Sequence, residues 1–138
     1  MHESLLLSLL RESCLGLPEV RETVKWGHPT FEAGKKMFAV LDQYDGNSCI
    51  AFRADSEKRE VLLAENRFFE PPYAARHGWI CLRADGPIDR IEVNQLLRDS
   101  YRLVALQRML TALEGAIALQ QTPKVPPSKR RIRGTGSA

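Results

Sequence analysis

Apolar side chains near the start of the chain recur at intervals of three and four, the spacing of one face of a helix. These side chains are Leu5, Leu6, Leu9, Leu10 and Cys14. The pattern predicts an amphipathic helix over residues 2–15, ended by Gly16 and Pro18. A second helix is predicted over residues 55–66, with Asp55 as its N-terminal cap.

Shorter apolar runs follow the first helix and predict four strands, at residues 23–26, 30–33, 37–41 and 48–53. Gly34-Lys35 suits a tight type II′ hairpin, and Asp45-Gly46 suits a turn whose two central residues both have positive φ. These connections are too short for parallel crossovers, so an antiparallel meander is expected. The run 37–41 is apolar at every position, which predicts a central strand covered on both faces.

Two further turns are predicted in this part of the chain. Gly27 and Pro29 flank His28 and indicate a turn between the first two strands. Residues 19–22 are expected to form another short turn.

The remaining elements are a short edge strand over residues 67–70, halted by Pro71-Pro72, and a strand over residues 78–83. A long helical element is predicted over residues 89–119. A straight helix of that length would measure about 45 Å, so either it bends near residues 102–105 or its second half packs on a partner chain as a homodimer contact. The expected fold class is α+β, with an antiparallel sheet packed against helices and an extended C-terminal helix.

Charge separates the chain into two parts. Five of its 20 Lys and Arg residues lie in residues 124–138, which contain no acid, leaving 15 bases against 17 acids in the rest. We therefore expect one domain over residues 1–121 and a disordered basic tail over residues 122–138.

The N-terminal leucines lack a basic flank, and no apolar run approaches the roughly 20 residues that span a bilayer. A cytoplasmic protein without membrane contact is expected. Cys14, Cys49 and Cys81 are far apart and each lies among apolar residues, which indicates reduced, buried thiols.

Several motifs in order resemble the MmcQ/YjbR family. The first is Lys25-Trp26-Gly27-His28-Pro29-Thr30-Phe31, followed by Gly34-Lys35-Lys36-Met37-Phe38-Ala39. The second group is Pro72-Tyr73, His77-Gly78-Trp79-Ile80 and Asp99-Ser100-Tyr101-Arg102-Leu103-Val104. The resemblance covers residues 2–105, and the helical extension 106–121 lies outside it.

This resemblance implies a compact α+β fold of the YjbR/CyaY, frataxin-like kind. It also implies DNA binding through a double wing of hairpins, with no catalytic residues and no cofactor. An iron role of the frataxin type would need a dense acidic ridge on the first helix, which offers only Glu3 and Glu12. We expect no metal site.

DNA is accordingly the expected partner, contacted at its phosphates by flexible cations. The candidate residues on the domain are Lys35 and Lys36 at a hairpin tip, with Arg67, Arg76 and Arg83 extending the same surface. The candidate residues on the tail are Lys129, Arg130, Arg131 and Arg133.

The alternative is a protein-interaction or small-ligand module with an aromatic and histidine pocket, formed by Trp26, His28, Tyr73, His77 and Trp79. The sequence offers no nucleophile with a matching base and no phosphate-cradling loop, so we do not expect an enzyme.

Overall fold

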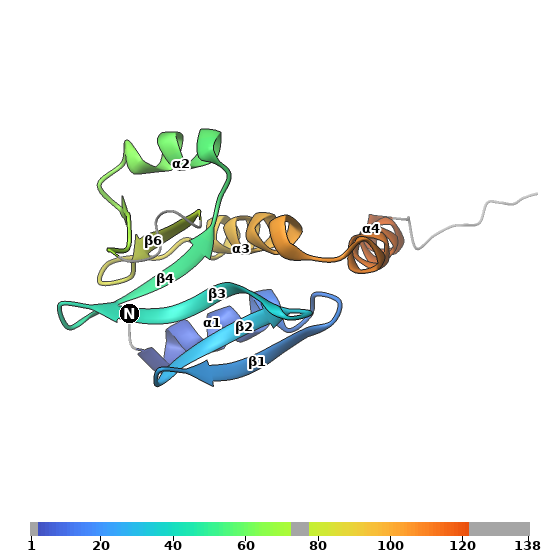
Figure 1. The fold of residues 1–138 in the computed structure, drawn as a ribbon, viewed down its shortest axis with the longest axis horizontal. Helices are drawn as coiled ribbons and strands as arrows, with labels where there is room; N and C mark the ends of the chain where they lie inside the picture. The colour runs from blue at the N-terminus through green and yellow to red at the C-terminus, as the bar shows by residue number, and fades with distance from the viewer. Residues whose placement is uncertain (1–2, 73–77, 122–138) are drawn as a thin grey trace, which may run out of the picture.

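In the computed structural model, which describes residues 3–72 and 78–121, six antiparallel strands form one sheet in the order β1-β2-β3-β4-β6-β5 (Figure 1). The strands are β1 Val20–Lys25, β2 His28–Ala33, β3 Lys36–Tyr44, β4 Asn47–Arg53, β5 Phe68–Phe69 and β6 Trp79–Arg83. The predicted meander of the first four strands and the predicted edge strand are confirmed. The strand β6 inserts between β4 and β5, an order that the sequence did not predict.

Tight turns connect the meander, and each contains a residue with positive φ. Asp45 and Gly46 have φ of 53° and 80°, as predicted, while Gly34 at 64° provides the positive φ that opens a type II′ turn. The predicted turn between the first two strands is confirmed, but its expected position around His28 was wrong. The turn is Trp26-Gly27, with φ of 52° and 80°, and His28 already pairs with Lys25 in the β1–β2 ladder.

Pro29 is tolerated inside β2 because the pairing of β2 with β3 begins only at Thr30, so no ladder donor is lost there. The short turn predicted for residues 19–22 was also wrong. Only Glu19 has a turn conformation, with φ of 58°, and β1 starts at Val20 because residues 20–25 find partners on β2.

The described helices are α1 Glu3–Cys14, α2 Ser56–Leu63, α3 Arg90–Val104 and α4 Gln107–Gln121. The predicted bend of the long helical element near residues 102–105 is confirmed. Ala105 is extended, with ψ of 147°, and the helices α3 and α4 on either side of it run in different directions (Figure 1). The carboxylates of Asp55 and Asp89 cap α2 and α3 by accepting backbone N–H hydrogen bonds. None of the described helices combines the length and the apolar character needed to cross a bilayer.

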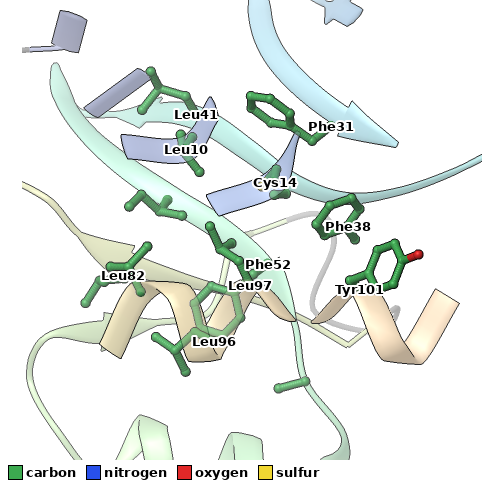
Figure 2. Close-up of a cluster of buried hydrophobic side chains, with 14 of the residues drawn as sticks. Leu10, Cys14, Phe31, Phe38, Leu41, Phe52, Leu82, Leu96, Leu97 and Tyr101 are labelled. Atoms are coloured by element: carbon green, nitrogen blue, oxygen red, sulfur yellow. The ribbon is translucent and has the colours of Figure 1, made fainter. Parts of the chain in front are cut away.

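One face of the sheet carries the main core. Figure 2 shows Leu10 of α1 and Leu97 of α3 among Phe31, Phe38 and Phe52 of the strands. Leu62 of α2 and Met109 of α4 complete the same core, so all four described helices contribute to it. On the opposite face, which we call the open face, a smaller cluster contains Cys49, Ala51, Trp79 and Cys81 and no described helix residue.

The strand β3 corrects the expectation of a central strand covered on both faces. Phe31 pairs with Ala39 and the next residue, Glu32, pairs with Met37, so Phe38 is the extra residue of a β-bulge. Phe38 and Ala39 both lie in the main core, whereas Met37 packs against the open-face cluster. The uninterrupted apolar run of β3 therefore reflects a bulge and one partly uncovered apolar face.

Candidate functional site

A groove of about 440 Å³ lies between the β2–β3 hairpin and the junction of α3 with α4. We call it the basic groove, because four cations and one carboxylate line it together with small and apolar residues. The lining residues are Glu19, Arg21, Ala33, Gly34, Lys35, Lys36, Val104, Leu106 and Arg108. The hairpin brings the two lysines to this position, since Gly34 and Lys35 are its two turn residues.

The cations of the basic groove differ in how far they are neutralised. Arg108 donates two hydrogen bonds to the carboxylate of Glu19, of 2.8 and 2.7 Å, and these bonds hold the pKa of Glu19 below its ordinary value. Arg21 donates to Glu32 at 3.1 Å. Lys35 and Lys36 are exposed and form no ion pair with any carboxylate of residues 3–72 and 78–121. Their charge is therefore available to an anion in solvent.

Arg67 does not join the two lysines. Its guanidinium donates hydrogen bonds to the carboxylates of Glu92 and Glu65, both at 2.6 Å, and these bonds raise the pKa of Arg67 above the ordinary guanidinium value. Glu92 lies at the start of α3, whereas the groove lies at the end of α3, about 18 Å away at 1.5 Å per residue. The other predicted cations, Arg76, Lys129, Arg130, Arg131 and Arg133, lie outside the described residues.

A second depression, of about 150 Å³, lies on the open face, and we call it the open-face hollow. Three residues of the predicted aromatic and histidine pocket, Trp26, His28 and Trp79, line it. Tyr73 and His77 fall outside the described residues. Further lining residues are Lys25, Thr30, Met37, Val40, Asp42, Tyr44, Ala51 and Pro71.

The two tryptophans of the hollow have very different exposure. Trp26 is 86% exposed at the β1–β2 turn, while Trp79 is 5% exposed. The guanidinium of Arg53 lies over the Trp79 ring, 4.9 Å from its centre, and its Nε donates to the carbonyl of Met37 at 3.0 Å. Burial lowers the pKa of Arg53, yet a guanidinium stays charged in proteins.

One corner of the hollow is polar. His28 Nε2 lies 3.4 Å from Asp42 Oδ1, and the Thr30 hydroxyl donates to the carbonyl of His28 at 3.0 Å. Burial, followed by the nearby charge of Asp42, raises the pKa of Tyr44, so its hydroxyl remains protonated. The hollow thus combines an apolar floor with a carboxylate and an imidazole at one side.

In the second motif group, residues 99–101 serve packing, whereas Trp79 lines the open-face hollow and Val104 lines the basic groove. Asp99 receives a 2.5 Å hydrogen bond from Lys58 of α2, and the Tyr101 hydroxyl donates to the carbonyl of Pro18 at 2.8 Å. Ser100 is fully buried and joins α3 to β3 and β4. These residues hold the helices on the sheet and line neither depression.

The cysteines are free and buried, as expected. Burial raises the pKa of Cys14, and the neighbouring Cys49 thiol, followed by burial, raises the pKa of Cys81. Both thiols are therefore held in the protonated, weakly nucleophilic form. Across the described part of the chain, no group of three or more His, Cys, Asp and Glu residues is placed to hold a metal ion.

Sequence reasoning missed several lining residues. Arg21 and Arg108 are 87 positions apart, and no local pattern connects them. Asp42 and Tyr44 could have been found, because the alternation of side chains along a strand places them on the same face as Val40.

Comparison with known proteins identifies the family. A search of curated proteins found no match. The sequence model of the YjbR family matches residues 15–103, nearly two thirds of the chain. Among solved structures, Deinococcus radiodurans protein DR2400, with a DUF419 domain, superposes with a TM-score of 0.62 at 23% identity, covering 86% of this chain and 91% of that one.

A Pseudomonas syringae protein from a structural genomics programme superposes with a TM-score of 0.58 at 14% identity, covering 75% of this chain and 98% of that one. At these identities the likeness concerns the fold. The sequence match covers both motif groups up to Leu103, and on that match the chain belongs to the YjbR family.

Proposed function

We propose that this YjbR protein binds DNA, without catalysis, through contacts of the β2–β3 hairpin with the phosphate backbone. The observation that carries the proposal is the pair of exposed hairpin lysines, Lys35 and Lys36, which have no carboxylate partner among the residues described. An unneutralised cation on an exposed part of a hairpin can approach a phosphate without first breaking an ion pair.

The contacts supporting this proposal carry no sequence information. A lysine ammonium acts as a point charge on a flexible stem, so it positions a duplex without reading its bases. The binding is therefore expected to be tolerant of DNA sequence and to weaken steeply with salt, because each phosphate contact releases a counterion. The tail cations Lys129, Arg130, Arg131 and Arg133 belong to the same proposal and would add flexible contacts.

The test compares how the wild type and the Lys35→Gln/Lys36→Gln variant bind duplex DNA. Binding is measured by fluorescence anisotropy at a series of salt concentrations. Loss of two phosphate contacts should lower the affinity at least about 10-fold at low salt and reduce the slope of log K against log salt by about two units. The positive φ of the hairpin turn belongs to Gly34, which is unchanged, and both lysine side chains are exposed, so the substitutions should leave folding unchanged.

A charge-matched control is Arg67→Gln/Arg90→Gln, which removes two cations at the other end of α3, where both are paired with glutamates. This control should bind DNA like the wild type. Equal weakening of both variants would mean that net charge governs binding rather than the hairpin, and unchanged binding of the lysine variant would refute the proposal.

One observation favours the second candidate, a small-ligand or protein-interaction module: Trp26, His28 and Trp79 line a single hollow. Its volume of about 150 Å³ suits one ring or one side chain. Titration with a one-ring aromatic compound, such as phenol, would give a saturable change in tryptophan fluorescence on this proposal. The variant Ala51→Leu, which fills the floor of the hollow, should abolish that change.

A further inference from the structure

We propose that the open-face hollow receives one unstacked pyrimidine base of single-stranded DNA. This inference rests on the proposed DNA binding and adds a second contact, on a different part of the molecule from the hairpin lysines. The hollow would then make the protein prefer single-stranded over duplex DNA.

The size of the hollow selects the kind of occupant. The hollow has a volume of about 150 Å³, the size of a cavity that holds one benzene-sized ring. A pyrimidine base is one such ring, whereas a purine has two, and a whole nucleotide is larger still. The sugar and phosphate of an inserted nucleotide would stay outside, where the strand continues.

The walls offer a stacking surface of the kind that binds unpaired bases. Trp26 presents most of its indole to solvent, because the positive φ of the β1–β2 turn places it at the hairpin tip. Met37, Val40 and Ala51 form an apolar floor beside it. An exposed indole next to an apolar depression gains by stacking on a base, which every base permits through its flat face.

The polar corner favours a base that carries an amino group. Asp42 lines the hollow with its carboxylate 3.4 Å from His28 Nε2. A carboxylate accepts a hydrogen bond from the N4 amino group of cytosine, whereas the O4 carbonyl of thymine would face it unfavourably. The expected preference is therefore for cytosine over thymine.

A free cation beside the hollow distinguishes a nucleotide from an apolar side chain of a protein partner. The Arg53 guanidinium lies over Trp79, and its described contacts are a ring and a carbonyl, with no carboxylate among them. It retains a full charge for the phosphate that follows an inserted base. The hollow therefore offers stacking and an edge acceptor, and Arg53 offers a phosphate contact beside Trp79, one of the lining residues.

The experiment uses the full-length protein and three short single-stranded oligonucleotides of equal length: oligo-cytidine, oligo-thymidine and a strand in which abasic sites replace all bases. All three carry the same phosphates. Oligo-cytidine should quench Trp26 fluorescence and bind at least about 10-fold more tightly than the abasic strand, the gain expected from one stacked base.

Two variants separate the base contact from the phosphate contacts. Trp26→Ala removes the stacking surface, and Ala51→Leu fills the floor while leaving Trp26 in place. Both should reduce oligo-cytidine binding to the level of the abasic strand and leave duplex binding unchanged. Val24→Ala is the matched control, because Val24 is an exposed residue of β1 two positions from Trp26 and does not line the hollow. A third variant, Asp42→Asn, should remove the preference for cytosine over thymine.

Equal binding of the oligo-cytidine and abasic strands would overturn the inference, as would wild-type binding by both Trp26→Ala and Ala51→Leu. Saturation of the hollow by phenol with no response to any oligonucleotide would also overturn it and would favour the ligand module. In each case duplex binding that depends on Lys35 and Lys36 would leave the proposed hairpin contact standing. Conversely, base-dependent binding without any effect of the lysine variant would refute the hairpin contact alone.

Discussion

Ser100 shows how one buried hydroxyl stabilises the layer between helix and sheet. Its Oγ accepts a hydrogen bond from the backbone N–H of Arg53 at 2.8 Å and donates to the carbonyl of Phe38 at 2.6 Å. Phe38 is the extra residue of the β3 bulge, so Ser100 provides a partner at an irregular point of the ladder. The role of Ser100 in this family-like motif is therefore to satisfy two backbone groups.

We expect Ser100→Ala to lower the free energy of unfolding by about 2 kcal/mol, because both backbone groups would lose their partner inside the protein. Urea denaturation measures the change. Ser8→Ala, at an exposed position of α1, is the control and should stay within about 0.5 kcal/mol of the wild type. Equal stability of the two variants would show that the Ser100 bonds contribute nothing net.

At the scale of elements, the β2–β3 hairpin and α4 support each other. A Cβ atom added to Gly34 would lie 3.0 Å from the Cε of Met109, and Gly34 has φ of 64°. Met109 and Leu113 of α4 are buried in the main core, and Arg108 ties α4 to Glu19. The hairpin that carries Lys35 and Lys36 is thus held in place by α4, the last described helix, which lies about 70 residues later in the sequence.

Two glycine substitutions should have opposite effects. Gly34→Ala should lower the free energy of unfolding by about 1–2 kcal/mol, because an L side chain is strained at this φ and the Met109 methyl must move. Gly115→Ala should raise it by about 0.5–1 kcal/mol, since the position is helical and no atom lies within 4 Å of the added Cβ. Thermal unfolding of both variants tests the pair, and a stable Gly34→Ala protein would contradict the tight packing of hairpin and helix.

At the scale of the whole molecule, two ion pairs link helices to the first strand region. One joins α4 to the residue just before β1, and the other joins α1 to β1. Arg108 of α4 pairs with Glu19, and Arg11 of α1 pairs with Glu22. Hydrogen bonds from the arginines are the largest cause of the lowered pKa of each glutamate. Outside residues 124–138 the chain has 15 bases against 17 acids, so the proposed DNA binding would depend on local groups such as the hairpin and on the tail cations rather than on a general charge of the body.

The same two glutamates make stability depend on pH. Their folded pKa values lie below the unfolded carboxyl value of about 4.3, so their contribution is present above that pH and is lost as the pH falls through the lower folded values. Glu19→Gln/Glu22→Gln should therefore flatten the acid side of the stability curve, measured as urea midpoints between about pH 5 and 3. Glu60→Gln, at an exposed position of α2, should keep the wild-type slope. An unchanged slope in the double variant would show that these pairs do not contribute to folding.

Local chemistry determined much of this protein from the sequence alone. Gly34 and the Asp45-Gly46 pair specified two hairpins, because positive φ is allowed to few residues and forces the chain to reverse there. The spacing of apolar residues specified the helices and the α+β class, because this spacing is a local property that involves only residues a few positions apart. The family resemblance, carried by short motifs such as Gly34-Lys35-Lys36, is confirmed by the match over residues 15–103.

Only the tertiary structure decided which distant segments meet. The place of β6 between β4 and β5, and the position of α4 against the β2–β3 hairpin, depend on packing between residues far apart in the chain. The start of β2 at His28 depended on the partner strand as well, because the ladder with β1 outweighs the turn preference of the local sequence. Arg21, Lys35 and Arg108 share a groove for the same reason: side-chain packing brings them together, and no local propensity encodes that neighbourhood.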